Sequence, residues 1–293
     1  MSFLTYLING ISLGSVYAII ALGYTMVYGI AKMLNFAHGD VIMVGGYVSY
    51  FAAGSFGLPP LAAVLAAMAA CTALGIVVER LAYKPLRSSA SLAVLITAIG
   101  VSYFLQNGAM LVWGSNPRVY SSLVGLAPVK LFGGGVTVSG EAIVTVAACL
   151  LIMGALLYLT GRTKLGKAMR AVSEDKGAAL LMGINVDSTI SATFAIGSAL
   201  AAVAGVLLCS AYPTLMPTTG SMPGIKAFTA AVFGGIGSVP GAFLGGILLG
   251  VIEKFSQAYI STQLSDAIVF AVLIVMLLVK PSGLLGRQTR EKV

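Results

Sequence analysis

The only histidine of the chain, His38, lies in the segment NFAHGD between Asn35 and Asp40. A histidine and a carboxylate can act as general acid and base, but no positioned nucleophile accompanies them, and one histidine cannot build an HExxH zinc site. We therefore expect no catalytic residue, no metal and no enzyme. Polar groups beside a spanning segment usually face a cavity or a partner. Asp40 is also a suitable N-cap for the next helix, and Asn35 can cap or turn, so a structural role is open too.

A second polar segment, residues 212–224, contains three prolines and three threonines. Proline removes a backbone donor and breaks a helix. A broken helix exposes backbone dipoles to a transported solute, and threonine hydroxyls can bind such a solute, but a surface loop outside the membrane explains the composition equally well. If both polar segments line a translocation path, its candidate residues are Asn35, His38, Asp40, Thr214, Thr218 and Thr219.

The connector at 161–188 contains a misleading motif. Its residues GRTKLGK match the phosphate-binding pattern GxxxxGK. However, Ala168 occupies the Ser/Thr position that magnesium needs, and the motif follows a predicted membrane helix instead of a strand. We reject nucleotide binding at this connector.

The same connector is predicted to form two short amphipathic helices. Residues 165–172 have apolar side chains at helical spacing, with Lys167 and Arg170 on the other side. Ser173 can N-cap a second helix, and Gly183 can end it in a left-handed conformation. This much structure indicates a docking element for a soluble protein, although helices lying in the lipid headgroups are a competing interpretation.

The composition decides the environment of these segments. The 293 residues are 58% hydrophobic and 9% charged, with a mean hydropathy of +1.00, whereas a soluble domain is about 25% charged. Such a chain cannot cover itself with solvated groups, so we predict an integral membrane protein. The net charge of +8 lies in short connectors, and we expect no nucleic-acid partner.

Apolar segments divide the chain into about nine predicted crossings. The first, residues 3–30, is longer than the roughly 20 residues that cross a bilayer, so it must tilt, bend or project. Several others are shorter than a full span and need polar or Gly-rich extensions in a protected interior. We predict an all-α, polytopic membrane helix bundle of about eight to ten transmembrane helices in one domain, 1–293. The other segments are 41–56, 61–78, 92–113, 142–159, 190–211, 225–236, 242–252 with a polar extension, and 267–279.

Positive charges set the predicted orientation. Cations gather at 80–87, at 161–188 and in the tail after 279, which we assign to the cytoplasm. The connector at 114–140 has only Arg118 and Lys130 as cations and is assigned to the outside. This tracing leaves the N-terminus outside and the C-terminus cytoplasmic. The first polar break then faces the cytoplasm and the second faces the outside, which favours an inverted repeat.

Glycine spacing indicates close helix packing. Two successive GxxxG spacings occur between 241 and 250. In lipid, small residues let backbones approach and gain dispersion contacts. Packing within the chain is the simpler interpretation, and a dimerisation motif is the alternative. The predicted packing residues are Gly234, Gly235, Gly241, Gly245, Gly246 and Gly250.

Four ordered motifs carry a resemblance that extends over essentially the whole chain. They are NFAHGD with the following Gly45-Gly46-Tyr47, GKAMRAVSEDKGAALLMGIN, AVFGGIGSVPGAFLGGILLG and KPSGLLG. Together they resemble the LivH-type permease subunits of bacterial ATP-binding cassette importers for branched-chain amino acids. Asn35, His38, Gly39 and Asp40 match a signature of that family, which we interpret as pathway or conformational support.

The resemblance implies a multi-pass permease of the bacterial inner membrane that moves leucine, isoleucine and valine into the cytoplasm. Its implied partners are a homologous second permease, two cytoplasmic ABC ATPase subunits and a periplasmic amino-acid-binding protein, all within membrane lipid. ATP and magnesium would bind to the ATPases, and no cofactor to this chain. One alternative is the same architecture with another small solute, such as an amide, urea or an aromatic acid. A stand-alone secondary transporter or channel is the other, and it would not need the docking connector.

The resemblance also gives the connector 161–188 a role in coupling to the ATPases. Its AALLMG segment preserves the AAxxxG core of the loop by which ABC permeases engage their ATPases. Gly177 stands where many such loops have glutamate, and a later proline is missing, which leaves the individual contacts open. The implied coupling residues are Lys167, Arg170, Glu174, Asp175, Ala178, Ala179 and Gly183.

Overall fold

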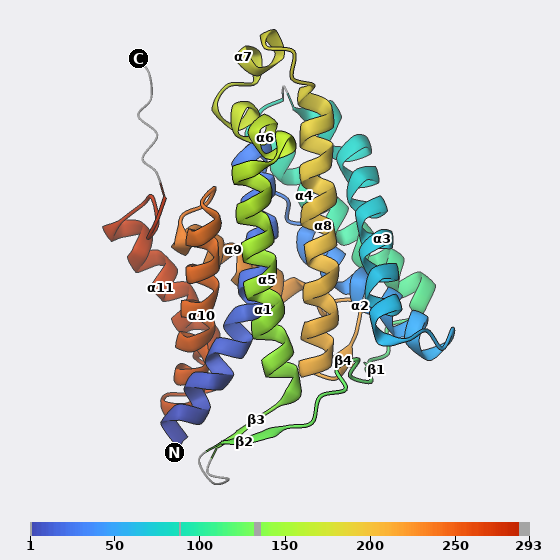
Figure 1. The fold of residues 1–293 in the computed structure, drawn as a ribbon, viewed down its shortest axis with the longest axis vertical. Coiled ribbons are helices and arrows are strands. Elements are labelled where there is room, and N and C mark those ends of the chain that lie inside the picture. Colours follow the sequence, from blue (N-terminus) through green and yellow to red (C-terminus); the bar gives the residue numbers. More distant parts are fainter. Residues whose placement is uncertain (1, 88, 132–135, 287–293) are drawn as a thin grey trace.

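The chain folds into a bundle of helices standing side by side (Figure 1), seen in a computed structural model that describes residues 2–87, 89–131 and 136–286. In this part of the chain, six helices are long and apolar enough to cross a membrane. They are α1 (Ser2–Ala31), α3 (Pro60–Val78), α4 (Ser91–Trp113), α5 (Gly140–Arg162), α8 (Val186–Ala211) and α10 (Val239–Tyr259).

Three further helices of the bundle are shorter than a full span. They are α2 (His38–Gly54), α9 (Ser221–Gly234) and α11 (Ser265–Val279), with 17, 14 and 15 residues. At 1.5 Å per residue, α9 is about 21 Å long, less than the hydrocarbon thickness of about 30 Å. The nine predicted segments correspond one for one to these nine helices, of which six have the length of a full crossing.

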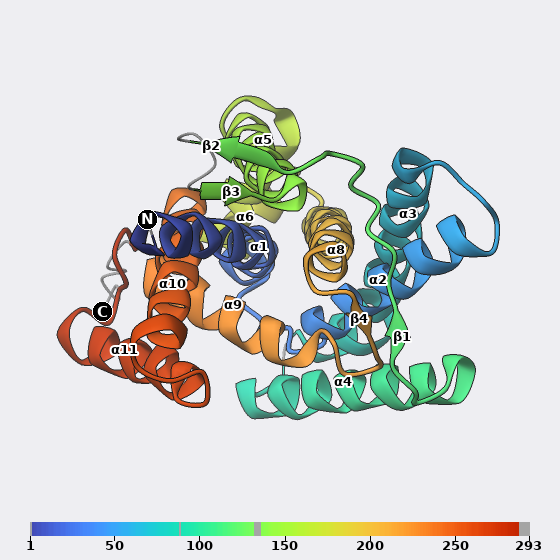
Figure 2. The ribbon, with the colours of Figure 1, turned by 90° about the horizontal axis from the view of Figure 1, so that it is seen from below.

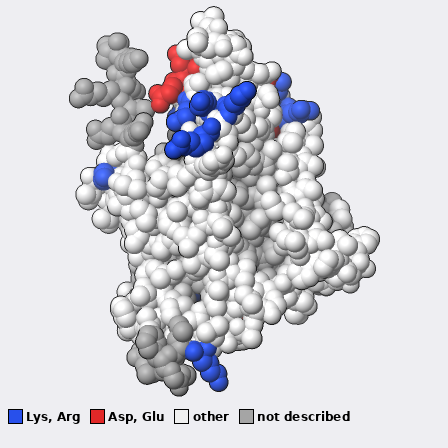
Figure 3. All heavy atoms as spheres, viewed as in Figure 1, with Lys and Arg blue, Asp and Glu red and all other residues white. Residues whose placement is uncertain are grey.

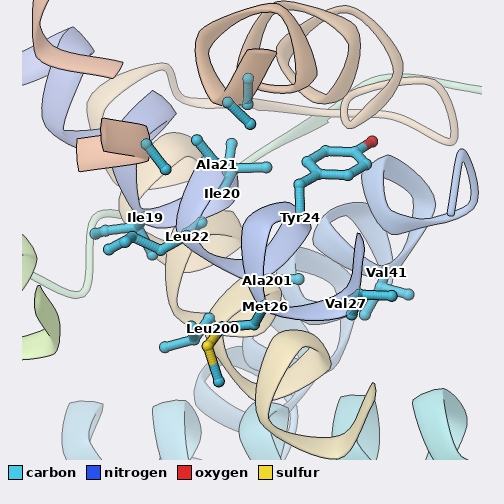
Figure 4. Close-up of a cluster of buried hydrophobic side chains, with 14 of the residues drawn as sticks. Ile19, Ile20, Ala21, Leu22, Tyr24, Met26, Val27, Val41, Leu200 and Ala201 are labelled. Atoms are coloured by element: carbon cyan, nitrogen blue, oxygen red, sulfur yellow. The ribbon is translucent and has the colours of Figure 1, made fainter. Parts of the chain in front are cut away.

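The central helix of the bundle is α1, which contacts α10, α8, α9 and α5. Its 30 residues form one continuous helix past Gly23 and Gly29, so its extra length needs no break. Residues 18–22 are fully buried and pack in an apolar cluster with side chains of α2 and α8, including Val41 and Leu200 (Figure 4). A helix that is apolar on all sides belongs in the interior, and α1 lies there.

The two ends of the bundle differ in structure and in charge. One end carries α6 and α7, and the other carries short antiparallel strand pairs, β1 with β4 and β2 with β3 (Figures 1 and 2). Most of the Lys and Arg side chains visible in Figure 3 lie at the α6–α7 end, which the positive-inside rule assigns to the cytoplasm. We call the opposite end the outer end. These elements are α6 (Lys164–Glu174), α7 (Lys176–Leu181), β1 (Arg118–Val119), β2 (Val129–Leu131), β3 (Val136–Val138) and β4 (Thr214–Leu215).

The N-terminal helix starts at the outer end and the connector with α6 and α7 lies at the other, as the tracing predicted (Figure 1). The predicted cytoplasmic tail begins with Lys280, and its other cations, Arg287, Arg290 and Lys292, lie outside the described residues. Before α4, α3 continues into one π-helical turn, η1 (Glu79–Tyr83), and a 3₁₀ turn, η2 (Lys84–Leu86).

The short helix α2 begins halfway through the bundle and runs to the outer end. Its first residue, His38, packs against Gly23 of α1. Gly23 lies eight residues before the end of α1, or about 12 Å along the helix. Near the other end of α2, the Ser49 hydroxyl is hydrogen-bonded to the Tyr120 hydroxyl at 2.8 Å. Tyr120 follows β1, so α2 ends among the outer strands.

The short helix α9 begins at the same midpoint and runs the opposite way. Its start packs on the start of α2 through Gly220 and Gly39. Just beyond its end, Gly237 packs against Gly29, close to the cytoplasmic end of α1. The break at 32–37 therefore reaches the midpoint from the cytoplasmic end, and the break at 212–220 reaches it from the outer end. This arrangement is the one that the predicted inverted repeat requires.

Candidate translocation and coupling sites

A cavity of about 270 Å³ lies where α2 and α9 begin, with α4 along its side. The two helix starts touch through glycine backbone. A β-carbon on Gly39 would lie 2.7 Å from the carbonyl oxygen of Gly220, so a larger residue would separate the helices. The cavity has a polar part, formed by Asp40, Ser102, Gln106 and Ser221, and an apolar part that includes Phe36, Ile99 and Ile225.

Asp40 is the centre of the polar part, with 1% of its surface exposed. The Gln106 side-chain nitrogen donates to an Asp40 carboxylate oxygen at 2.9 Å. The same nitrogen lies 3.2 Å from the Ser221 hydroxyl and 3.3 Å from the Ser102 hydroxyl. Polar groups from α2, α4 and α9 thus meet at the Gln106 side-chain nitrogen.

The predicted N-cap role of Asp40 is wrong. α2 begins two residues earlier, and Ala37 occupies the N-cap position without a side-chain hydrogen bond. The amide of His38 donates to the carbonyl of Asn35, and the amide of Asp40 to the carbonyl of Ala37. Because this turn satisfies the first amides of the helix, the Asp40 carboxylate is left to face α4.

His38 and Asn35 are buried but do not line the cavity. The His38 ring packs on the Tyr24 ring, with 4.6 Å between centroids, and its Nε2 has no hydrogen-bond partner among the described residues. The side-chain oxygen of Asn35 accepts a 2.9 Å hydrogen bond from the Tyr83 hydroxyl in the π-helical turn. Asn35 therefore joins the first break to the end of α3. Of the three candidates in this segment, the structure brings only Asp40 to the cavity.

Two of the predicted threonines border a different cavity. Thr214 and Thr219 line a space of about 310 Å³ between α1, α8 and α10. The Thr219 hydroxyl also accepts a hydrogen bond from the Met216 amide at 2.8 Å and so shapes the second break. Thr218 is exposed and does not line this cavity. Asp40 thus lines one cavity and Thr214 and Thr219 line another, whereas the other three candidates line neither.

A buried ion-pair network was missed by sequence reasoning. Lys226 of α9 lies 2.8 Å from a carboxylate oxygen of Glu253 in α10 and 2.6 Å from one of Asp266 in α11. The Tyr17 hydroxyl donates to the other Glu253 oxygen at 2.9 Å. The available signal was a lysine inside the apolar segment 225–236, because a charge at membrane depth needs a partner.

A second ion-pair network, also missed, lies at the cytoplasmic end. Arg87 contacts the carboxylates of both Glu79 and Asp187, and Lys84 lies 2.7 Å from Asp187. Glu79 is fully buried and also accepts a 2.6 Å hydrogen bond from the Ser191 hydroxyl. These contacts join the end of α3 to the start of α8, beside the connector.

The connector forms two helices, as predicted, but one cap differs. α6 extends through Glu174, and Ser173 lies inside it, donating to the carbonyl of Arg170. Asp175 is the N-cap of α7, because its carboxylate accepts from the amides of Gly177 and Ala178 at 2.7 and 3.0 Å. The prediction that Ser173 caps this helix is therefore wrong.

The end of α7 follows the prediction for Gly183, whose φ is +81°. The amide of Gly183 donates to the carbonyl of Leu180 and that of Ile184 to the carbonyl of Ala179, which is the Schellman arrangement.

The GxxxxGK motif joins two helices. Gly161 lies in α5 and α6 begins three residues later, so the motif does not follow a strand.

The face that α7 presents is apolar. Leu181 and Met182 are 90% and 81% exposed at the cytoplasmic tip, whereas Ala179 is buried at its base. On α6, Met169 and Val172 are buried while Lys167 and Arg170 are exposed, as its amphipathic pattern predicted. The structure places Glu174, Asp175, Ala178 and Gly183 at the exposed surface of the same connector.

The connector also contacts the end of α1. The Lys176 ammonium donates to the carbonyl oxygen of Ala31, the last residue of α1, at 3.2 Å. Burial lowers the pKa of Lys176, and the nearby charges of Arg87 and Lys32 lower it further. A displacement of α7 would thus act directly on α1, just before the first break.

The predicted packing glycines lie between helices of this one chain. Gly234 packs against Gly241, and Gly245 packs against α9. Gly246 and Gly250 pack against α1, at Ala18 and Gly14. Gly235 is the exception, because it follows α9 with a φ of +106° and packs against residues 285–286, beyond the end of α11. The GxxxG spacings of α10 therefore join it to α9 and α1.

The fold and site define a class of protein. Long apolar helices surround two half-length helices whose starts meet halfway through the bundle at a polar cavity, and a structured connector protrudes at one end. This is the architecture of a polytopic membrane permease. Residues 6–277 match the model of the family described as branched-chain amino acid transport system / permease component, and the chain belongs to that family.

Individual relatives extend the comparison over nearly the whole chain. LivH, a high-affinity branched-chain amino acid transport system permease protein of Escherichia coli K12, is 44% identical over 99% of this chain and 98% of its own. BraD of Pseudomonas aeruginosa, with the same description, is 46% identical over the same shares. A probable LivH of Methanocaldococcus jannaschii is 29% identical over 92% of this chain and 88% of its own.

Proposed function

We propose that this chain is the inner-membrane permease subunit of an ATP-binding cassette importer that moves leucine, isoleucine and valine into the cytoplasm. The observation that carries the proposal is the 44–46% identity, over 99% of the chain, to permeases of branched-chain amino acid transport systems. ATP hydrolysis belongs to partner subunits, and the permease supplies the path.

The proposed assembly contains a homologous second permease, two cytoplasmic ABC ATPase subunits and a periplasmic amino-acid-binding protein. The surface of the chain fits two of these partners. The apolar tip of α7, with Leu181 and Met182, suits a groove on a cytoplasmic ATPase. Beside the Asp40 cavity, Met222 and Ile225 of α9 are exposed and suit a second permease. In this assembly the C-terminal tail is cytoplasmic.

The proposed mechanism begins at the connector. Closure of the ATPases on ATP would push α6 and α7, and Lys176 would pass that movement to the end of α1 through its bond to Ala31. The breaks at 32–37 and 212–220 lie on opposite sides of the midpoint, so the bundle can open to either end in turn. An amino acid delivered by the binding protein would cross the midpoint, and weak contacts there would permit its exit.

The proposal is tested by reconstituting the chain with its partner subunits in liposomes and measuring ATP-dependent uptake of labelled leucine, isoleucine and valine. Uptake of all three is expected. Uptake of an amide, urea or an aromatic acid in their place would favour the same architecture with another solute, and uptake without the ATPases would favour a secondary transporter.

The coupling role is tested with Leu181→Asp, which places a charge on the exposed tip of α7. At least a tenfold loss of co-purified ATPase is expected, since a carboxylate is poorly accommodated in an apolar groove. Leu126→Asp, at an exposed leucine of the outer connector, is the matched control and should retain the ATPases. Full ATPase yield with Leu181→Asp would exclude the tip of α7 from the contact.

A further inference from the structure

The Asp40 cavity has charges of opposite sign on two of its sides. A helix N-terminus carries roughly half a positive charge, and both α2 and α9 begin at this cavity. Asp40 contributes one negative charge near the start of α2. The side nearer α4 is therefore negative at the carboxylate, and the start of α9 is positive. Such a pair of charges complements a small zwitterion.

We propose that this cavity binds the transported α-amino acid as a zwitterion, with its ammonium group on Asp40 and Ser102 and its carboxylate at the start of α9 beside Ser221. This inference rests on the proposed function and adds to it a substrate site within this chain. It makes Asp40 a substrate-binding residue, and it assigns a role to Gln106, which positions the carboxylate through their 2.9 Å hydrogen bond.

The ammonium half of the site follows from the partners of the Asp40 carboxylate. Among the described residues, no lysine or arginine forms an ion pair with Asp40. A buried carboxylate that has only neutral partners is costly, and a cation that enters its cavity lowers that cost. A primary ammonium has three donors, which the Asp40 carboxylate and the Ser102 hydroxyl on the same cavity wall can accept.

The carboxylate half of the site follows from the start of α9. Helix N-termini stabilise anions through their amide groups and their dipole. Ser221 is the first residue of α9, and its hydroxyl lines the cavity 3.2 Å from the Gln106 nitrogen. The Ser221 hydroxyl and the positive end of the helix dipole therefore face the cavity. The Ser221 amide itself donates to the carbonyl of Thr218, and Pro223 has no amide hydrogen, so the hydroxyl and the dipole carry this half of the site. The Ser221 hydroxyl and the Asp40 carboxylate lie 3.2 and 2.9 Å from the same Gln106 nitrogen, so the ammonium group must lie between the two carboxylates to offset their repulsion.

The apolar wall fits the side chain of a branched-chain amino acid. Phe36, Ile99 and Ile225 line the cavity around its polar part. The volume of about 270 Å³ is just below the usual range of roughly 300–1,000 Å³ for ligand pockets, which suits a small ligand. Aliphatic and aromatic walls gain from burying a leucine or isoleucine side chain and offer nothing to an uncharged polar solute.

The test measures leucine imported per ATP hydrolysed by the complete transporter in liposomes. Asp40→Asn keeps the size of the side chain and removes its charge, and we expect a fall of at least tenfold in this ratio. Asp40→Glu should restore part of it. The matched control is Ser49→Ala, a buried position on the same helix that bonds to Tyr120 and lies outside the cavity, and it should keep the wild-type ratio.

If Asp40 only fastens α2 to α4, Asp40→Asn would slow ATP hydrolysis and uptake together and leave their ratio unchanged, which would overturn the substrate site. If Asp40→Asn does not assemble, Ser102→Ala retains the carboxylate and its bond to Gln106. A threefold fall in its ratio is expected, and an unchanged ratio would again overturn the site. Failure of the wild-type transporter to import leucine would instead overturn the proposed function.

Discussion

Asp40 and Glu253 are both buried carboxylates beside a cavity, but they are stabilised in different ways. Glu253 accepts hydrogen bonds from the Lys226 ammonium, the Tyr17 hydroxyl and the Gln257 amide. Asp40 accepts from the neutral amide of Gln106. The first charge is neutralised by the protein itself, whereas the second is left for a ligand to neutralise. The comparison distinguishes a carboxylate that holds helices together from one that can bind a passing cation.

The largest expected effect comes from removing the cation of the first site. Lys226→Met leaves Glu253 buried without its ammonium partner, and breaking a buried ion pair costs about 3–5 kcal/mol. We expect the thermal unfolding midpoint in detergent to fall strongly, together with the yield of assembled complex.

The double variant Lys226→Met with Glu253→Gln is the control, since it removes both buried charges of the pair. It should recover much of the lost stability, although Asp266 then also lacks its partner. A Lys226→Met protein as stable as the wild type would contradict the structural role of this network and would weaken the contrast with Asp40.

A smaller effect is expected from Gly220→Ala at the junction of the two half-length helices. The new β-carbon would overlap the carbonyl of Gly39, and overpacking of this kind costs about 1–3 kcal/mol. The starts of α2 and α9 would separate at the Asp40 cavity. Leucine uptake should therefore fall further than the loss of stability alone would explain. Both are measured on the reconstituted complex.

Gly54→Ala is the matched control for this change. It adds the same β-carbon to a glycine of α2 that has open space around it. It should be neutral or slightly stabilising, because alanine favours a helix over glycine. Equal losses of uptake in the two variants would show that leucine uptake does not depend on the close contact between Gly39 and Gly220.

The smallest effect is expected from Tyr17→Phe, which removes one hydrogen bond to Glu253 and leaves the lysine in place. The net loss should be about 1 kcal/mol, as for a single hydrogen bond. Thermal unfolding in detergent measures it, and leucine import per ATP should stay at the wild-type value. A changed ratio would mean that the Glu253 cavity also takes part in transport.

Much of the fold could be predicted from local patterns in the sequence. The predicted segment 92–113 became α4 at Ser91–Trp113, and 190–211 became part of α8. Spanning helices are long apolar runs, so hydropathy alone finds them. The end of α7 before Gly183 was also predictable from the local sequence, because the left-handed residue that follows a helix is most often glycine.

The candidate site was predictable only in part. Asp40 was singled out as polar beside an apolar segment, but its partner Gln106 lies 66 residues away on α4, and only the packing of α4 brings them together. Ser173 was predicted as the cap of α7, but the sequence does not show which residue has the extended backbone that a cap needs. In the structure Asp175 has it, with φ −153° and ψ 115°.

By itself, the sequence determined the membrane environment and the positions of the helices, and it predicted which charged end faces the cytoplasm. These follow from transfer free energies of side chains, which depend on each segment alone. Only the tertiary structure decided that two half-length helices start back to back at Gly39 and Gly220, and that Lys226 neutralises Glu253 while Asp40 has no such partner among the described residues. Those outcomes depend on contacts between segments far apart in the chain, and backbone approach and charge pairing are settled only when the helices pack.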